Sequence, residues 1–275
     1  MLIKIVDTTL RDGEQRAGVV LRKNDKIQIA KMLDYMGVYQ IEAGIPAMGG
    51  EEKNSIYEIM GLGLKSRISA WNRMNINDIK ESIDINPHIM HISVPSSDIQ
   101  IQHKFGKDRE WVLENMMTCV NYAREKGFEV TLGLEDASRA DFNFILSIIT
   151  YAYKLGVERV RYADTVGILY RNKIYQDIQI IKKHFRNIKL EIHTHNDLGM
   201  AVSNSIGAVR GGVEFVDCTI GGIGERAGNC DFLKFVISAK GLLGSCKKYN
   251  VKEINRIQKS ILKIIDRQYE GSSVC

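Results

Sequence analysis

Two histidines stand two positions apart in the run from Leu190 to His195, which reads LEIHTH. Apolar and polar side chains alternate in this run, as is typical of a β-strand whose successive side chains point to opposite faces. His193 and His195 then share one face, with their Cα atoms about 7 Å apart. Imidazoles at this spacing can bind one metal ion, and a half-buried strand with hydrogen-bonded histidines is the alternative.

An early carboxylate and a late amide extend this pair to a mixed set of oxygen and nitrogen ligands. Asp12 follows the first apolar run, and Asn229 ends a glycine-rich loop that begins at residue 221. Such a set suits a divalent ion such as Mg, Mn or Zn. Few protein ligands leave positions open for a bidentate molecule such as a 2-oxo acid. Arg11 would then donate to its keto oxygen, and the alternative for Arg11 and Asp12 is a surface salt bridge.

Other charged residues near these positions have two interpretations each. Glu191 shares the histidine face of its strand, where it either orients an imidazole or is satisfied deeper in the fold. Glu135 and Asp164 either hold substrate groups or cap helices, and Glu135 is the stronger functional candidate. Arg226 lies in the glycine-rich loop, where it either turns inward toward carboxylates or belongs to a flexible connection.

Short β-rich runs alternate with helical runs through most of the chain, and we count eight strand-helix units. The predicted strands are 4–10, 40–44, 67–71, 89–95, 129–135, 159–165, 190–195 and 215–220. The predicted helices are 24–36, 51–61, 77–83, 108–126, 141–155, 173–185, 200–210 and 231–242. Eight such units predict an α/β fold, a closed (β/α)8 TIM barrel. An open doubly wound sheet is the alternative, and it lacks support because no glycine-rich phosphate loop follows the first strand.

The barrel predicts where the polar residues meet. Strand one lies beside strand eight, and strand seven is next, so the residues at their carboxyl ends share one rim, where barrel enzymes place their chemistry. We predict a barrel domain over residues 1–242 and a short C-terminal helical extension over 243–275. Apolar residues from Val251 to Ile265 recur at three- and four-residue spacing, which predicts one amphipathic helix there.

Composition excludes several classes of protein. The 275 residues are 44% hydrophobic and 26% charged, as in globular enzymes, and the net charge of +5 is spread along the chain. We therefore expect a solvated surface and no nucleic-acid partner. No apolar run has the length of a membrane helix, so we expect no membrane partner. Five cysteines without a CxxC pair indicate a reduced, cytoplasmic setting.

Three motifs carry a family resemblance. They read DTTLRDGEQ at 7–15, with Lys26 eleven positions after Gln15, then HTHNDLG at 193–199 and GERAGN at 224–229. In this order they resemble the barrel metalloenzymes that include 2-isopropylmalate, homocitrate and citramalate synthases and hydroxymethylglutaryl-CoA lyase. The first motif and the run EDASR at 135–139 are most similar to the homocitrate synthases of nitrogen-fixing bacteria and to isopropylmalate synthases. The lyases have a cysteine where this chain has Ile223, so lyase chemistry is disfavoured.

The resemblance implies an acyltransferase that condenses acetyl-CoA with a 2-oxo acid in a Claisen-type reaction and releases CoA. It implies a divalent metal bound by Asp12, His193, His195 and Asn229. It also implies catalytic roles for Arg11 and Glu135, and contacts to the 2-oxo acid from Arg11, Gln15, Asn75, Glu135 and Thr165. The first choice of substrate is 2-oxoglutarate, which gives homocitrate, and the alternative is an activity like that of isopropylmalate or citramalate synthase.

Two departures from the family pattern bear on the substrate and the partner. Thr131 stands where some homocitrate synthases have an arginine that binds the distal carboxylate of 2-oxoglutarate, whereas Asn75 favours a polar substrate. Synthases of this family also continue past the barrel into a segment that supplies catalytic His and Tyr residues. No histidine follows His195 in this sequence, and Tyr249 and Tyr269 match no such segment.

We therefore expect one subunit of a split synthase, in a homo- or hetero-oligomer whose second synthase subunit supplies the lid. A subunit that binds metal and a 2-oxo acid without turnover of its own is a second hypothesis. An aldolase or lyase that needs no lid is a third.

Overall fold

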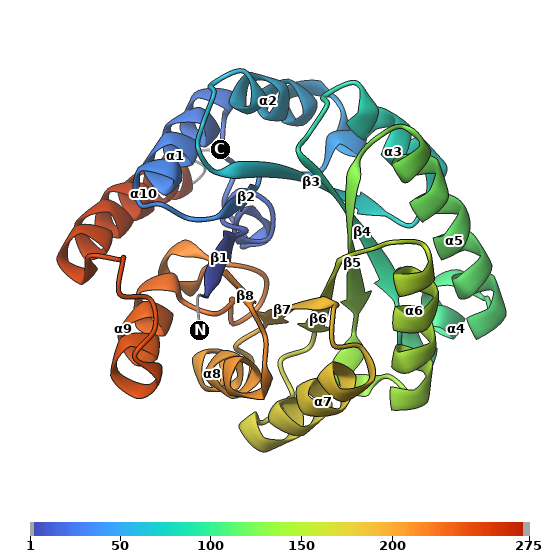
Figure 1. The fold of residues 1–275 in the computed structure, drawn as a ribbon. Coiled ribbons are helices and arrows are strands. Elements are labelled where there is room, and N and C mark those ends of the chain that lie inside the picture. The colour runs from blue at the N-terminus through green and yellow to red at the C-terminus, as the bar shows by residue number, and fades with distance from the viewer. Residues whose placement is uncertain (1–2, 272–275) are drawn as a thin grey trace.

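The computed structural model describes residues 3–271, and eight parallel strands close into a barrel in chain order (Figure 1). Each strand pairs with the next one along the chain, and the last pairs with the first, where Asp7 is the register partner of Cys218. The closed barrel confirms the predicted fold class. The strands are β1 (Lys4–Asp7), β2 (Gln40–Glu42), β3 (Arg67–Arg73), β4 (Ile89–Pro95), β5 (Glu129–Glu135), β6 (Arg159–Asp164), β7 (Lys189–Thr194) and β8 (Phe215–Cys218).

Helices surround the barrel on its outside (Figure 1). The α-helices are α1 (Lys23–Tyr35), α2 (Gly50–Met60), α3 (Ile76–Ile83), α4 (Asp98–Phe105), α5 (Arg109–Glu125), α6 (Phe142–Lys154), α7 (Arg171–His184), α8 (Ala201–Gly211), α9 (Phe232–Leu243) and α10 (Val251–Gly271). Four short 3-10 turns lie in the loops that follow strands: η1 (Gly13–Gln15), η2 (Pro46–Met48), η3 (Ala137–Arg139) and η4 (Ile220–Gly222).

The predicted boundaries are correct to within two residues, except at the end of the first strand, and the differences at the first and last strands lie in loops at the carboxyl ends of strands. The first strand ends at Asp7 rather than at residue 10, and the last at Cys218 rather than at residue 220. Their apolar tails, up to Leu10 and Ile220, are buried in turns instead. The helix α4 was not predicted. It has eight residues, and Ser97 caps it through a hydrogen bond from the amide of Gln100.

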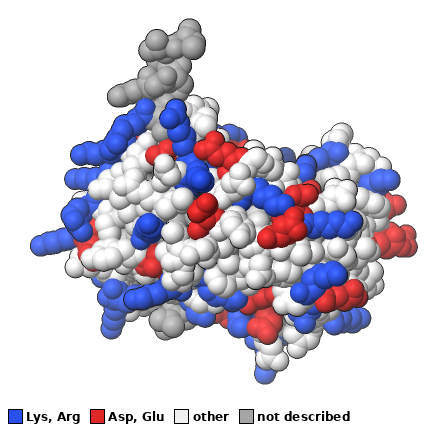
Figure 2. Space-filling view, turned by 90° about the horizontal axis from the view of Figure 1, so that it is seen from above, with Lys and Arg blue, Asp and Glu red and all other residues white. Residues whose placement is uncertain are grey.

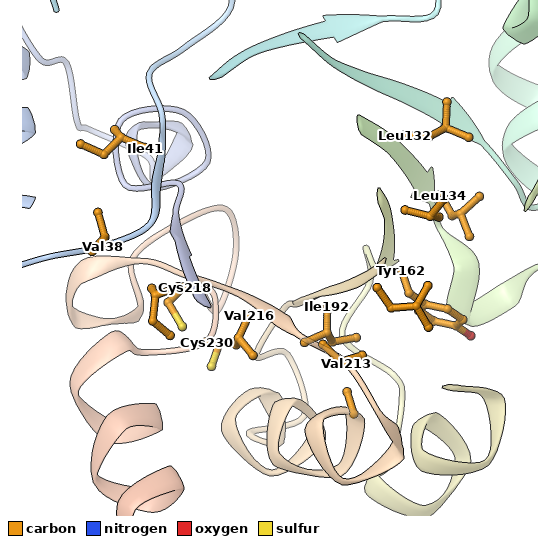
Figure 3. Packing of buried hydrophobic residues seen from close by; sticks show 14 of the residues in the cluster. Val38, Ile41, Leu132, Leu134, Tyr162, Ile192, Val213, Val216, Cys218 and Cys230 are labelled. Atoms are coloured by element: carbon orange, nitrogen blue, oxygen red, sulfur yellow. The ribbon is translucent and has the colours of Figure 1, made fainter. Parts of the chain in front are cut away.

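The side chains on the outward and inward faces of the strands differ in chemical character. Apolar residues on the outward faces of the strands pack against the helices, as Figure 3 shows for Ile192 and Val216. The inward faces of β6 and β7 instead carry Arg161 and Glu191, which are almost fully buried. The interior of the barrel is therefore ionic, and its outer shell is apolar.

The last helix, α10, packs beside α1 and α9 (Figure 1). Its buried residues include Ile254, Ile257 and Ile261, which follow the predicted amphipathic spacing. The division into a barrel domain of 1–242 and an extension stays a prediction. Of the predicted extension, residues 272–275 lie outside the described part of the chain, as does the side chain of Tyr269.

Other sequence predictions concern the surface and the cysteines. On the face shown in Figure 2, Lys and Arg side chains are interspersed with Asp and Glu. The four cysteines among the described residues are free and buried, and Cys275 lies outside them. Within residues 3–271, no helix combines the length and the apolar character needed to cross a membrane.

Candidate metal and substrate site

A cavity of about 250 Å³ opens at the carboxyl ends of the strands. Its wall contains seven of the nine residues predicted for the site: Arg11, Asp12, Gln15, Glu135, Thr165, His193 and His195. These residues come from the loop after β1 and from the ends of β5, β6 and β7. The structure thus brings the first and second motifs of the sequence to one place.

Asp12, His193 and His195 form a buried triad in the wall of this cavity. The Nε2 atoms of the two histidines are 3.2 Å apart. An Oδ2 atom of Asp12 lies 3.6 Å from the nearer and 3.8 Å from the farther of them. Each residue thus offers one ligand atom, and these atoms lie within 4.8 Å of one another.

Asp217 on β8 fixes the orientation of the His193 ring. Its Oδ2 lies 2.9 Å from Nδ1 of His193, and Thr8 donates a hydrogen bond of 2.7 Å to its Oδ1. A carboxylate at Nδ1 favours a proton there, which leaves the lone pair of the neutral ring on Nε2, toward His195. Burial opposes a charge on His193, but Asp217 and Asp12 outweigh it and raise the pKa of this histidine.

The other two members of the triad have shifted pKa values that suit ligands. Burial, followed by the proximity of His193, lowers the pKa of His195 to about 4, so its ring is neutral at neutral pH. Burial alone would raise the pKa of Asp12, but Arg11 and the two histidines lower it to about 2. The triad is therefore one carboxylate with two imidazoles, which is a donor set for a divalent ion.

Asn229 lies next to the triad because the loop after β8 runs antiparallel to the end of β7, where it bridges to His195. Its Nδ2 donates to Asp12 Oδ1 at 2.6 Å. Its Oδ1 is buried and has no hydrogen-bond partner among residues 3–271. Gly224 permits this packing, because a Cβ there would lie 2.1 Å from Nδ2 of Asn229. The structure thus places Asn229 beside the candidate ligand Asp12, and its own role as a ligand remains part of the proposal.

Arg11 links the triad to the ionic interior of the barrel. Its Nη1 donates to Asp12 at 2.7 Å, and its Nε donates to Glu42 at 2.7 Å. The same Glu42 accepts from Arg161 at 2.8 Å, and Arg161 donates to Glu191 at 2.5 Å. Burial opposes the charge of Glu42, but Arg161 and Arg11 hold its pKa well below the ordinary value. This chain of ion pairs fixes the plane of the Arg11 guanidinium.

Glu191 therefore follows the second of the two predicted interpretations. Its carboxylate bonds to Arg161 deeper in the barrel, and Arg159 lies 3.2 Å from its other oxygen. The residue that orients an imidazole is Asp217.

Most of the predicted substrate residues line the central cavity, and Asn75 lines a neighbouring groove. Glu135 accepts hydrogen bonds from Gln100, Lys104 and Ser93. Thr165 accepts from the amide of Asp136 at 2.8 Å, and Gln15 is exposed at the mouth of the cavity.

Asn75 is the predicted substrate residue that lies outside the wall of this cavity. Its side chain accepts from the amide of Asn77 and so caps α3, and it lines a neighbouring groove. This groove shares Glu135 and Lys104 with the central cavity, and contact of Asn75 with the substrate stays a prediction. Its place at the start of a helix, after a strand, was a signal for a cap.

Residues of the site that the sequence prediction missed include Asp217, His91 and Lys104. Asp217 interrupts the apolar strand β8 with a charge on the inward face, a signal that the sequence contained. His91 lies in the cavity wall, with Nδ1 2.9 Å from Thr131 Oγ1. Burial, followed by the charge of Arg161, holds the pKa of His91 well below its ordinary value, so its ring is neutral. Lys104 lies on the helix that was not predicted.

The buried charges give an independent test of whether a cation fits. Three guanidinium groups and four carboxylates make up the network: Arg11, Arg159 and Arg161 with Asp12, Glu42, Glu191 and Asp217. The carboxylates exceed the guanidinium groups by one, and two ring nitrogens face each other beside that excess. A divalent cation at the triad would satisfy both features.

The substitution Asp217→Asn tests the orienting role of this carboxylate. The amide keeps the shape but removes the negative charge that favours a proton on Nδ1 of His193. We expect the affinity for Mn²⁺ or Zn²⁺ to fall about 10- to 100-fold, as for other residues that orient a ligand histidine. Titration calorimetry measures it, with Asp231→Asn, at the cap of α9, as the control. An affinity equal to that of the unchanged chain would contradict the assignment.

Fold and site together define a (β/α)8 barrel with a candidate divalent-metal centre at the carboxyl ends of its strands. The chain belongs to the HMGL-like family, whose model matches residues 2–261.

Sequence relatives are consistent with the resemblance inferred from the three motifs and confirm it. The chain is 57% identical to the homocitrate synthase subunit alpha of Clostridium pasteurianum over 89% of this chain and 90% of that one. It is 47% identical to 2-isopropylmalate synthase 2 of Caldanaerobacter subterraneus over 86% of this chain. It is 43% identical to homocitrate synthase 1 of a Nostoc species over 88% of this chain. The matches span only 62% and 64% of these last two proteins.

Solved structures support the fold. The HMG-CoA lyase of Brucella melitensis superposes with a TM-score of 0.83 at 17% identity, over 96% of this chain and 99% of that one.

Proposed function

We propose that this chain is the barrel subunit of a homocitrate synthase-like acyltransferase. In this reaction acetyl-CoA condenses with a 2-oxo acid, and the thioester is then hydrolysed to release CoA. The observation that supports it most is the triad of Asp12, His193 and His195 beside Arg11, in the wall of a cavity that can take a small acid. The Clostridium relative, matched over nearly its whole length, bears the name of this activity.

The triad, with Asn229 as a fourth candidate, would hold the divalent ion. When bound, that ion supplies a Lewis acid for the keto group of a chelated 2-oxo acid. The residues themselves orient the reactants. Hydrogen bonds to Glu42 and Asp12 occupy Nε and Nη1 of Arg11. Its Nη2 has no acceptor among the described residues, so it is free to donate to the keto oxygen as negative charge develops there.

Two carboxylates of the wall, Glu135 and Glu225, lie outside both the triad and the arginine network. The side chain of Glu135 is 21% exposed and that of Glu225 is 46% exposed, so Glu135 is the more enclosed. We assign Glu135 to proton handling: it accepts a proton from the acetyl methyl group as the new carbon-carbon bond forms to the keto carbon. The keto oxygen then takes a proton, and water attacks the thioester.

The polar character of the wall supports 2-oxoglutarate as the substrate. Thr131 stands where some homocitrate synthases have an arginine. It is hydrogen-bonded to His91 and offers no positive charge to the distal carboxylate. Lys104 is the cationic group of the wall that extends toward solvent, with its side chain 53% exposed, and it lies 3.2 Å from Glu135. We propose that Lys104 binds the distal carboxylate, with the neutral His91 and Ser93 beside it.

The substitution Lys104→Met tests this assignment. A hydrogen bond to a charged group contributes about 1.5–3 kcal/mol, so we expect the KM for 2-oxoglutarate to rise roughly 10- to 150-fold. The KM for 2-oxobutyrate, which lacks the distal carboxylate, should stay unchanged. Lys107→Met, in the turn after α4, is the matched control. Equal effects on both substrates would count against a specific contact.

The proposed function itself is tested by CoA release, measured with a thiol reagent. The purified chain, Mn²⁺ and acetyl-CoA are mixed with 2-oxoglutarate, 2-oxoisovalerate or pyruvate, with and without the product of the adjacent gene. We expect release with 2-oxoglutarate when the second polypeptide is present, because the cavity contains no His or Tyr beyond His91 and the triad among the described residues. Release with another acid would favour the isopropylmalate or citramalate alternative. Metal-dependent binding without release under any condition would favour a binding subunit.

A further inference from the structure

A buried lysine lies behind the loop that carries Arg11 and Gln15. Lys26 is in the first half of α1, and its side chain is 1% exposed. Its Nζ contacts two carboxylates, Glu14 at 2.5 Å and Glu52 at a shorter distance. A buried cation between two carboxylates is costly to form and is stable only if its hydrogen bonds are satisfied.

The two carboxylates continue from Lys26 into the backbone of two different loops. Glu14 Oε1 accepts the amide of Leu21 at 2.9 Å, which closes the loop after β1. Glu52 Oε1 accepts the amide of Ile45 at 2.9 Å, which closes the loop after β2. Lys26 is therefore the common centre of hydrogen bonds that fix both loops.

These two loops form one side of the cavity. The first supplies Arg11, Asp12 and Gln15, and the second supplies Ile45. Glu14 and Gln15 are neighbours in the turn η1, so an anchored Glu14 sets the direction of Gln15. The outer groove beside it, lined by Val19, Val20 and Met48, is open.

We propose that Lys26 is a positioning residue of the reaction: through Glu14 and Glu52 it holds the loops after β1 and β2 so that Arg11 and Gln15 face the 2-oxo acid. Lys26 does not line the cavity and touches no substrate. The inference rests on the proposed function for its catalytic consequence. Its structural part, the fixing of two loops by one ammonium group, stands without it.

The substitution Lys26→Met keeps most of the length of the side chain and removes its charge. The two carboxylates then repel each other, and both loops lose their anchor. We expect hydrogen exchange at the amides of Leu21 and Ile45 to become faster, while exchange within α6 stays unchanged. A misplacement of about 1 Å can cost roughly 100-fold, so we expect kcat/KM for the 2-oxo acid to fall by about that factor.

Lys53→Met is the matched control. Lys53 also contacts two carboxylates, Glu81 at 2.7 Å and Asp84 at 2.8 Å, but on the outer surface. We expect neither loop exchange nor kcat/KM to change in this variant. If Lys26→Met does not fold, Glu52→Gln replaces it, because glutamine still accepts the Ile45 amide while one ionic contact is lost. Its expected effects have the same direction and a smaller size.

The outcomes separate this inference from the proposed function. If the unchanged chain releases no CoA, the proposed function fails, and the dissociation constant of 2-oxoglutarate in the presence of Mn²⁺ replaces kcat/KM. Faster exchange at Leu21 and Ile45, together with weaker substrate binding or turnover, supports the positioning role. Unchanged exchange at both amides overturns it. Faster exchange with unchanged substrate kinetics and affinity overturns it as well, because Lys26 would then be structural only.

Discussion

Replacement of His195 by alanine should abolish metal binding and, with it, CoA release. His195 is neutral at neutral pH and presents its Nε2 to that of His193 at 3.2 Å. Alanine removes one of the three convergent ligand atoms. Asp12 and His193 alone are then too few protein ligands to hold the ion. The loss should exceed the roughly 10- to 100-fold in affinity that removal of an orienting residue costs.

Three measurements check this prediction. Metal content after dialysis and calorimetric titration with Mn²⁺ report binding, and a thiol reagent reports CoA release. His184→Ala is the control, because His184 is an exposed histidine at the end of α7 whose Nδ1 lies 2.9 Å from a backbone carbonyl oxygen. We expect this control to behave as the unchanged chain. Full metal affinity in His195→Ala would show that the triad is not the metal centre.

The barrel was predictable because its signals are local and repeated. The strands β4 and β5 have the predicted bounds, since most of their residues are β-branched or apolar and each is closed by a clear turn. The positions of Asp12, His193 and His195 followed from topology alone. A closed barrel places strands one and seven on either side of strand eight, so residues far apart in the sequence share a rim.

The residues that orient and surround the triad were less predictable from the sequence. That Asp217, not Glu191, orients His193 depends on how deep each carboxylate lies in the barrel, which alternation along a strand does not specify. The helix α4 was missed because its eight residues form less than a full amphipathic pattern and its stability comes from contacts with α5. Lys104 was missed with it. A polar residue after a strand fits both a cap and a site, and for Asn75 the structure shows the cap while the substrate contact stays a prediction.

Replacement of Arg161 by methionine should destabilise the fold more than any surface substitution. Arg161 is 2% exposed and contacts Glu42 and Glu191, which are also buried. Methionine fills most of its volume but leaves two buried carboxylates short of a partner. Breaking a buried ion pair by removing one side costs about 3–5 kcal/mol, because a charge without compensation stays in the interior. We expect a loss of that size in the free energy of unfolding, measured by urea denaturation.

The control for Arg161 is Arg67→Met on β3. Arg67 forms an exposed ion pair of 2.6 Å with Glu129, and such pairs contribute about 0–1 kcal/mol. The difference between the two variants isolates burial, because both remove one guanidinium from a strand of the same barrel. The substitution Arg161→Met should also change the site. Glu42 would keep only the hydrogen bond from Arg11, and the Arg11 guanidinium would move toward Glu42 and away from the keto oxygen. A loss below about 1 kcal/mol would mean that Arg159 and Arg11 compensate for the missing charge, and that the ionic interior is not the element that fixes Arg11.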